Sequence, residues 1–232
     1  MAHRFYIPQL QLNQNELPED EAHHAIHVLR LKVGDTFEVF DGIGNFAEAT
    51  MISLGKKACS CEVNQLQLVE KSNHQLHLAI APPKNADRWD WILEKAVELN
   101  VHTIIPLLCE RSERKQINEE RMHKIVLSAS KQSLRYFLPV VKPLIPFQTF
   151  IQTKFENALI AHCDLKFERV PISNKIIHQN QTLVMIGPEG DFSSNEIQTA
   201  YQLGFSGINL GNLRLRTETA AIAVCAAFQL SH

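Results

Sequence analysis

Five short apolar segments, separated by segments of helical periodicity, constrain most strongly how this 232-residue chain can fold. Such short and nearly continuous apolar runs are typical of strands that are buried on both faces of a parallel sheet. The runs cover residues 77–82, 103–109, 158–163, 182–187 and 207–211. Because strand and helix alternate, we predict an α/β domain with right-handed crossovers.

The predicted helices of this domain have recognisable ends. Ser193 and Glu196 form a capping-box pattern, and Thr217 is the predicted cap of the last helix, with Glu218 in its first turn. The last helix is apolar almost all round, which predicts that it is buried, in part against another subunit. The four helices are predicted over residues 87–99, 118–133, 193–204 and 217–230.

The first 72 residues follow a different pattern, with one predicted helix at 19–31. Short segments that alternate with period two are separated by turns, of which Asp41-Gly42 is the strongest hairpin signal. This spacing of strands and turns predicts a small barrel. We therefore predict two domains, residues 1–72 and residues 73–232. The predicted strands of the first are 37–40, 46–53, 58–63 and 65–70.

Charge is unevenly distributed, although the formal net charge of the chain is only −2. Residues 1–72 hold six Lys and Arg against ten Asp and Glu, whereas residues 111–142 hold eight basic residues against three acidic ones. A basic stripe of this kind forms either a phosphate-binding face or a solvated helix surface. The near-neutral chain as a whole argues against non-specific nucleic-acid binding, so a nucleic-acid partner should be a defined structure.

Several classes of protein are disfavoured by the sequence. No apolar run approaches the roughly 18 residues of a membrane helix, and the opening residues do not form a secretory signal. The five cysteines are scattered and contain no CxxC pair, which points to a reduced compartment and away from a disulfide framework or a zinc site. We therefore expect a cytoplasmic protein without a membrane segment or a metal.

The sharpest local motif is the loop Gly187-Pro188-Glu189-Gly190, which follows a buried strand and precedes a capped helix. Such a loop allows a ligand to approach the backbone closely. It lacks the GK[ST] ending of a phosphate-binding P-loop, and Glu189 and Asp191 would repel a polyphosphate but tolerate a cation or a proton donor. A plain strand-to-helix turn is the alternative interpretation.

A second glycine-bearing strand end leads through Arg214 and Arg216 into the last helix. These arginines could bind a phosphate or a polarised base carbonyl, or they could be surface residues that pair with Glu218. Ligands of α/β proteins bind at the carboxyl ends of strands, which favours a site at the two loops. The dinucleotide-like pattern at 42–47 leads into a strand instead of a helix, which excludes it.

Five motifs in order along the chain resemble those of the ribosomal RNA small subunit methyltransferase E family, a branch of the SPOUT methyltransferases. Two departures from the family pattern stand out. Asp191 lies where a second glycine is usual, and Leu213 lies where an arginine is usual, so that the arginine of this chain, Arg214, comes one position later. The motifs are RFY (4–6) with VLRLKVGD (28–35), Lys84 and Arg88 with ELNVHTIIP (98–106), QSLR (132–135), GPEGDF (187–192) and LGNLRLRTETA (210–220).

The resemblance implies an amino-terminal PUA/OB-like β-barrel and a carboxyl-terminal SPOUT α/β domain with a trefoil-knotted parallel sheet. It also implies S-adenosylmethionine as cofactor and a homodimer as the assembly. The implied reaction is methylation of uracil N3 at one uridine of 16S rRNA in the small ribosomal subunit. The rival interpretation is a non-catalytic RNA-binding or ribosome-assembly factor that keeps the fold.

On this basis we assign roles to individual residues. Arg216 would orient or stabilise the uracil, and Glu189 or Glu218 would accept the proton. The expected cofactor-binding residues are Ile186, Gly187, Pro188, Glu189, Gly190, Leu210, Gly211, Leu215, Thr217 and Ala220. The expected RNA contacts are Arg4, Arg30, Lys84, Arg88, Arg111 and Arg135.

Overall fold

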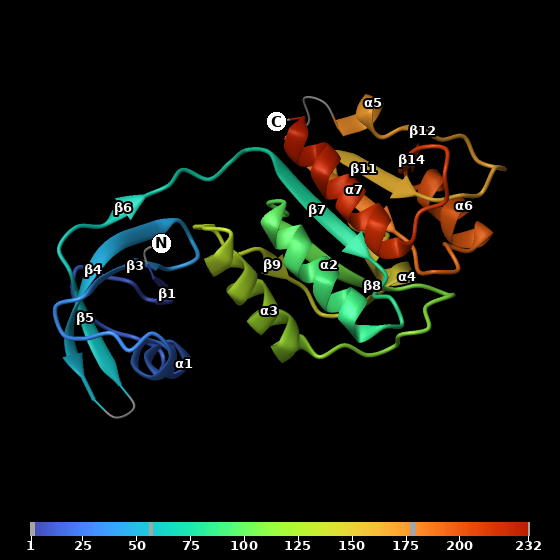
Figure 1. Cartoon of the computed structure of the whole chain (residues 1–232). Helices are drawn as coiled ribbons and strands as arrows, with labels where there is room; N and C mark the ends of the chain where they lie inside the picture. The colour runs from blue at the N-terminus through green and yellow to red at the C-terminus, as the bar shows by residue number, and fades with distance from the viewer. Residues whose placement is uncertain (1–2, 56–57, 177–179, 232) are drawn as a thin grey trace. The chain divides into compact units, whose positions relative to one another are not determined.

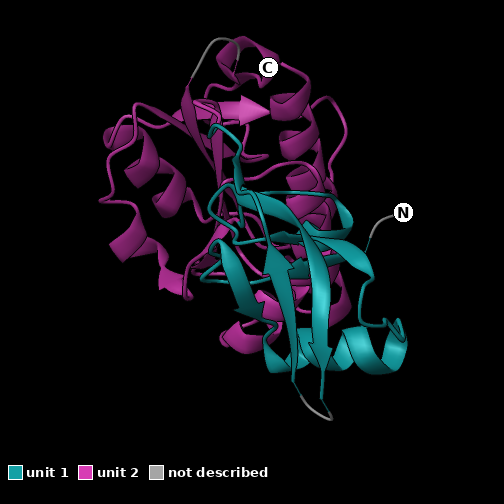
Figure 2. Cartoon of the chain, turned by 90° about the vertical axis from the view of Figure 1, so that its left-hand side faces the viewer, with its two compact units in different colours: residues 1–71, 130–138 teal, residues 72–129, 139–232 magenta. Residues whose placement is uncertain are grey.

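The computed structural model describes residues 3–55, 58–176 and 180–231, and the chain divides into two compact units (Figures 1 and 2). The first unit holds residues 1–71 together with 130–138, and the second holds residues 72–129 and 139–232. The sequence predicted a single boundary near residue 72 and left 130–138 in the second domain. The structure instead places this segment in the first unit.

The first unit is built on one six-stranded sheet in the order β1-β3-β4-β5-β2, with β6 paired to β4. Strands β1 and β3 are parallel, and the other pairs are antiparallel. Alternate side chains such as Phe37, Val39, Ala47 and Ala49 are buried in its core, as period-two patterning requires. The strands are β1 (Arg4–Tyr6), β2 (Asn13–Glu16), β3 (Thr36–Phe40), β4 (Asn45–Leu54), β5 (Cys59–Val63) and β6 (Gln67–Leu68).

The helix of the first unit is shorter than the predicted span 19–31. It consists of α1 (Glu19–His23), which continues as a π-helix over His24–Val28 (η1). Arg30 has a φ of 55°, and this left-handed backbone conformation cannot continue a right-handed helix.

Residues 130–138 are held in the first unit by aromatic and backbone contacts. The Tyr136 ring lies 4.3 Å from the Phe46 ring between centroids. The amide of Leu138 donates to the carbonyl of Gly42 at 2.9 Å, and Phe137 forms a β-bridge with Ile43. These contacts join residues about 90 positions apart in the chain, which the local sequence pattern could not indicate.

The second unit is an all-parallel sheet, as predicted, in the order β10-β8-β7-β13-β11-β14-β12, with β9 paired to β8. The five predicted apolar runs form β7, β8, β11, β13 and β14. The trefoil knot stays a prediction. The strands are β7 (Gln75–Ile80), β8 (Thr103–Leu108), β9 (Val140–Val141), β10 (Ile145–Pro146), β11 (Asn157–Ala161), β12 (Val170–Pro171), β13 (Gln181–Ile186) and β14 (Ser206–Asn209).

Helices cover both faces of this sheet. One core lies between the sheet and α2, α3, α5 and α7, and includes Ile80, Ala161 and Ile186. The other lies between the sheet and α4 and α6, and includes Ile160 and Met185 from the alternate strand positions. The helices are α2 (Ala86–Glu98), α3 (Glu119–Gln132), α4 (Phe147–Phe150), α5 (Ser173–Ile176), α6 (Ser194–Gln202) and α7 (Thr217–Leu230).

The helix ends follow the predicted signals at α6 but not at α7. Ser193 and Glu196 form the complete capping box of α6. The N-cap position of α7 is Arg216 and not Thr217, which is the first helical residue. The Thr217 hydroxyl donates instead to the carbonyl oxygen of Gly187 at 3.3 Å, so a contact distant in sequence takes the place of the local cap.

Candidate functional site

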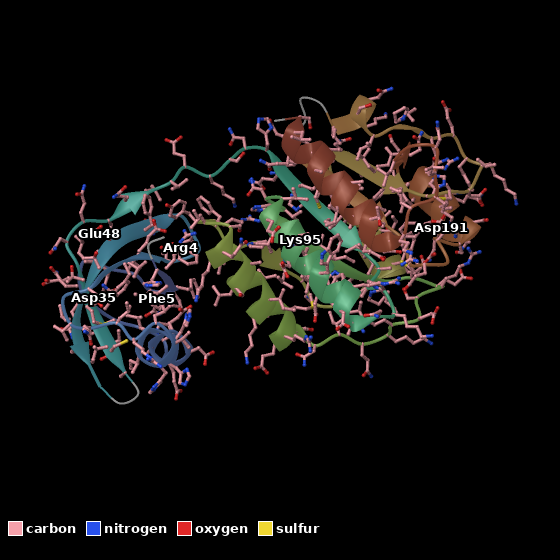
Figure 3. The ribbon with its side chains drawn as sticks, in the orientation of Figure 1. Arg4, Phe5, Asp35, Glu48, Lys95 and Asp191 are labelled. Carbon is pink, nitrogen blue, oxygen red and sulfur yellow. The ribbon has the colours of Figure 1, made fainter. Side chains whose placement is uncertain are left out.

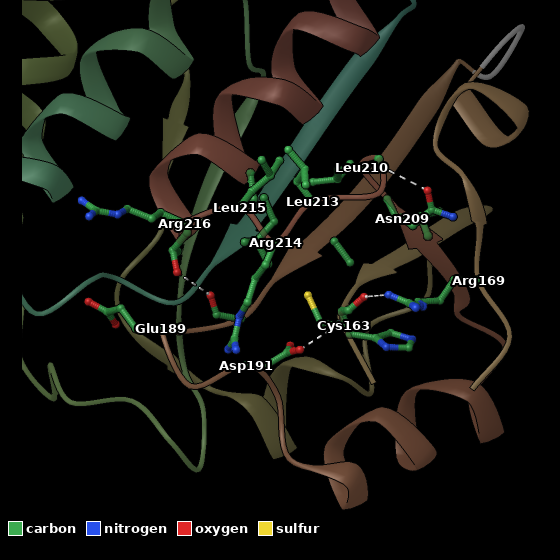
Figure 4. Close-up of a pocket in the computed structure, with 18 of the residues that line it drawn as sticks. Cys163, Arg169, Glu189, Asp191, Asn209, Leu210, Leu213, Arg214, Leu215 and Arg216 are labelled. Carbon is green, nitrogen blue, oxygen red and sulfur yellow. Dashed lines mark hydrogen bonds between the residues drawn. The ribbon is translucent and has the colours of Figure 1, made fainter. Parts of the chain in front are cut away.

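A cavity of about 890 Å³ opens at the carboxyl ends of β11, β13 and β14 in the second unit (Figure 4). Strand β11 pairs with β13 on one side and with β14 on the other. The segments that follow these three strands therefore meet at one edge of the sheet. Gly187, after β13, and Gly211, after β14, both line the cavity, so the two glycine-bearing loops border a common space.

The expected cofactor-binding residues line this cavity, with one exception. Gly190 is not among the lining residues; its carbonyl oxygen accepts a hydrogen bond of 2.9 Å from Arg111. The residues that do line it are Ile186, Gly187, Pro188, Glu189, Leu210, Gly211, Leu215, Thr217 and Ala220.

The loop after β13 is fixed by contacts from neighbouring strand ends. The amide of Lys84, in the segment after β7, donates to Glu189 Oε1 at 2.9 Å. Arg111, in the segment after β8, donates through Nη1 to the carbonyl oxygens of Gly190 and Phe192, at 2.9 and 3.3 Å. The conformation of the loop is thus set by residues from two other parts of the chain.

Four arginines and two acids give the cavity its charge. Arg214 and Arg216 are exposed, and within the described parts of the chain no hydrogen bond or ion pair engages either guanidinium. Both arginines line the cavity together with Glu189 and Asp191, so their donors are available to a ligand. The four lining arginines are Arg88, Arg169, Arg214 and Arg216.

Glu218 lies beside the cavity but does not line it. Its side chain is 13% exposed, and Oε1 lies 3.4 Å from Arg88 Nη1. Its Oε2 atom is buried and has no hydrogen-bond partner among the described residues. Of the two acids considered as proton acceptors, Glu189 lines the cavity, whereas Glu218 is paired with Arg88.

The arginines expected to contact RNA in the first unit differ in accessibility. Arg4, labelled in Figure 3, has a side chain that is 4% exposed, and its Nε lies 2.7 Å from Glu38 Oε1. Its guanidinium carbon lies 4.2 Å from the centroid of the Phe40 ring and 4.5 Å from that of Tyr136. Burial lowers the pKa of Arg4. Arg30 is exposed at the end of the π-helix. The packing of Arg4 favours a structural role, whereas Arg30 is accessible.

Arg135, also in the first unit, is half-buried, and burial lowers its pKa to about 10. It therefore remains charged at neutral pH.

In the second unit, Lys84 forms an exposed ion pair with Glu113 at 2.7 Å, which raises the pKa of Lys84. Arg111 is exposed but bonded to the loop after β13, as described above.

Several basic side chains of the stripe at 111–142 are paired with acidic side chains. Arg121 Nε donates to Asp90 at 2.9 Å, and Lys124 pairs with Glu120 at 2.7 Å on α3. Within the first unit, Lys131 pairs with Glu21 at 2.8 Å. These pairs favour the solvated-surface interpretation for the middle of α3.

The segment after β11 forms a wall of the cavity that was not predicted. Its lining residues were missed because no glycine or motif marks them; the only signal was that the predicted strand 158–163 ends there. Figure 4 shows the Cys163 sulfur pointing toward the loop that carries Leu213. The residues concerned are His162, Cys163, Leu165, Phe167 and Arg169.

Two family models match the chain along most of its length. One, described as an RNA methyltransferase domain, matches residues 70–229, and the other, an RNA methyltransferase PUA domain, matches residues 17–64. Fold, site and these matches define the class: an RNA methyltransferase with an amino-terminal PUA domain.

Individual relatives agree over the full length. Ribosomal RNA small subunit methyltransferase E of Rickettsia conorii is 30% identical, covering 98% of this chain and 95% of its own. A crystal structure of a probable rRNA-methyltransferase from Porphyromonas gingivalis superposes with a TM-score of 0.91 at 37% identity, covering 99% and 98% of the two chains. A crystal structure of a ribosomal RNA small subunit methyltransferase E from Neisseria gonorrhoeae, bound to S-adenosyl methionine, superposes with a TM-score of 0.85 at 30% identity. The match covers 99% of this chain and 98% of that one. The chain belongs to the ribosomal RNA small subunit methyltransferase E family.

The described helices are all too short or too polar to cross a bilayer.

Proposed function

We propose that the chain binds S-adenosylmethionine in the cavity at the ends of β11, β13 and β14, and transfers its methyl group to N3 of one uracil in 16S rRNA. The observation that carries the proposal is the common cavity between the loops after β13 and β14. Ligands of parallel α/β sheets bind at such strand ends, and the volume lies in the usual range for ligand pockets. A relative of known structure was crystallised with this cofactor.

The lining residues fit an S-adenosyl group. Ile186, Ile208 and Leu210 offer apolar surface for the nucleoside. Glu189 and Asp191 offer negative charge, which suits a sulfonium cation. Backbone carbonyl and amide groups at the two glycine-bearing loops supply further polar contacts.

When bound, the cofactor supplies a methyl group carried on a positive sulfur. Arg216 places guanidinium donors at the mouth of the cavity, where they stabilise the negative charge that develops on the carbonyl oxygens flanking uracil N3. Glu189 lies within the cavity and accepts the N3 proton, directly or through water. Glu218 holds Arg88 and does not act on the base.

The variant Arg216→Ala tests this assignment. Methyl transfer to 16S rRNA, supplied free and as assembled small subunits, is expected to be lost, while S-adenosylhomocysteine affinity by calorimetry stays within about threefold. Lys154→Ala, which removes one exposed positive charge elsewhere in the second unit, serves as the matched control. Equal losses of transfer and of cofactor affinity would assign Arg216 a structural role.

The protein is proposed to act as a cytoplasmic homodimer. Ile222, Ala223 and Ala226 on α7 are only half-buried, and Leu230 is 87% exposed. A second copy of the chain would cover this apolar surface. Sedimentation of the purified protein should give twice the chain mass of 26.4 kDa, and Ala223→Glu should shift it toward the monomer.

A further inference from the structure

Asp191 occupies an unusual backbone position in the loop after β13. Its φ is 63°, in the left-handed region, which Asp and Asn adopt more readily than most residues other than glycine. Its amide donates to the carbonyl of Pro188 at 2.9 Å, which closes the turn. The side chain is thereby directed from the loop toward the neighbouring strand end.

The Asp191 carboxylate joins the segments after two adjacent parallel strands. Oδ2 accepts a hydrogen bond of 2.7 Å from the amide of Cys163, and Oδ1 accepts one of 2.8 Å from the amide of Phe192 (Figure 4). Cys163 follows β11 and Asp191 follows β13, and the last residues of these strands, Ala161 and Ile186, are paired. Both carboxylate oxygens are thus engaged by backbone amides at the edge of the cavity.

The segment that Asp191 holds is irregular and depends on a few side-chain bonds. Arg169 Nη1 donates to the carbonyl of His162 at 2.8 Å, which closes the segment on itself. Ser194 at the start of α6 donates to Asp164 at 3.1 Å, and the Tyr201 hydroxyl donates to the carbonyl of Glu168. Within the described parts of the chain, the hydrogen bond that Asp191 accepts from the Cys163 amide is the one that joins this wall of the cavity to the loop after β13.

We propose that Asp191 is a positioning residue for the methyl donor: it fixes the spacing between the Gly187–Asp191 loop and the Cys163–Arg169 segment, two walls of one cavity. This inference rests on the proposed function. A wall that is already in place need not be ordered when the ligand binds, so the bond increases affinity. The family pattern has a second glycine where this chain has Asp191, so the bond to the Cys163 amide is a feature of this chain.

Three variants of the full-length protein test the proposal. Asp191→Gly removes both bonds yet tolerates the left-handed backbone. Asp191→Asn also tolerates it and keeps one carbonyl acceptor. Glu156→Gln removes an exposed carboxylate at the amino end of β11, away from the cavity, and is the matched control. Calorimetric titration with S-adenosylhomocysteine gives Kd and stoichiometry, and thermal unfolding gives Tm.

Asp191→Gly is expected to raise Kd about tenfold at unchanged stoichiometry, corresponding to roughly 1.4 kcal/mol. Asp191→Asn should recover at least half of that loss on a logarithmic scale, and Glu156→Gln should bind as the wild type does. Amide hydrogen exchange in the Cys163–Arg169 segment should rise in Asp191→Gly.

Unchanged or tighter binding by Asp191→Gly would overturn the positioning role while leaving the proposed function intact. A fall in Tm or in stoichiometry with an unchanged Kd would also overturn it, because that is the result of a purely structural role. If the wild-type protein itself takes up no S-adenosylhomocysteine, the proposed function fails and this inference fails with it.

Discussion

The hydroxyl of Thr217 donates a hydrogen bond of 3.3 Å to the carbonyl oxygen of Gly187, so the first turn of α7 is joined to the loop after β13. Thr217 is 5% exposed and Gly187 is buried. The bond spans 30 positions of sequence. It connects the segment that leads into α7 to the loop after β13, both of which border the cavity.

Thr217→Val tests the contribution of this bond, because valine keeps the shape of threonine but cannot donate. A buried carbonyl left without its donor costs about 1–3 kcal/mol, so we expect a lower Tm and several-fold weaker S-adenosylhomocysteine binding. Thr217→Ser keeps the hydroxyl and should bind within about twofold of the wild type. If valine and serine variants bind equally well, the hydroxyl does not hold the cavity.

Gly187 is predicted to tolerate no side chain. A Cβ atom there would lie 2.9 Å from the amide nitrogen of Phe192, a backbone atom that cannot move without shifting the loop. Gly187→Ala should therefore abolish measurable cofactor binding while the protein remains folded by circular dichroism.

The neighbouring glycine supplies the control for this prediction. A Cβ atom on Gly190 would meet its nearest atoms, both in the Arg111 side chain, at 3.5 Å, which is ordinary van der Waals contact. Gly190→Ala should bind S-adenosylhomocysteine within about threefold of the wild type. Equal effects of the two alanines would show that the loop senses substitution in general and not the contact at Gly187.

Arg30 and Arg4 should separate RNA binding from stability in the first unit. Arg30 is exposed, so Arg30→Glu should weaken binding to 16S rRNA and reduce the salt dependence of log Kd by about one unit of slope or more.

Arg4 is buried beside Glu38 and two aromatic rings. Arg4→Met should lower the free energy of unfolding by about 1–2 kcal/mol, because the partly exposed Glu38 carboxylate loses its cationic partner and keeps the Tyr136 hydroxyl.

Filter binding across a salt series measures the first effect, and urea unfolding measures the second. The salt slope of Arg4→Met should match that of the wild type. An unchanged slope in Arg30→Glu would remove this residue from the RNA-binding surface, and a changed slope in a folded Arg4→Met protein would return Arg4 to it.

Much of the second unit could be predicted because its signals are local. The buried runs at 182–187 and 207–211 form β13 and β14, and Ser193 caps α6 through bonds that lie within four residues. That Gly187 and Gly211 line the same cavity could also be predicted, because parallel strands have their carboxyl ends at the same edge of a sheet.

What could not be predicted depends on contacts between distant residues. The fold of 130–138 into the first unit depends on the packing of Tyr136 against Phe46. The wall after β11 depends on the hydrogen bond that the Cys163 amide donates to Asp191. Thr217 is of a residue type that commonly caps helices, yet its hydroxyl donates to the carbonyl oxygen of Gly187. In each case a tertiary partner, absent from the local pattern, decided the outcome.

His162 should make the stability of the second unit sensitive to mild acid. The side chain is 5% exposed, and burial lowers its pKa below the ordinary histidine value. In the unfolded chain the imidazole takes up a proton near pH 6.5, whereas in the folded chain it does so only at lower pH. Its contribution to stability is therefore fully present above about pH 6.5 and is lost as the pH falls through the folded pKa.

Urea unfolding at pH 7.5 and pH 5.5 checks this effect. The free energy of unfolding of the wild-type protein should fall between pH 7.5 and pH 5.5, and that of His162→Gln, whose side chain cannot titrate, should fall less. The variant should also be less stable than the wild type at pH 7.5, because the contact of His162 Nε2 with the Tyr201 hydroxyl at 3.2 Å is altered. His24 in the first unit also has a lowered pKa through burial, so His24→Gln gives the contribution of that unit separately. Identical pH dependence in wild type and His162→Gln would show that the buried imidazole is not the group that titrates.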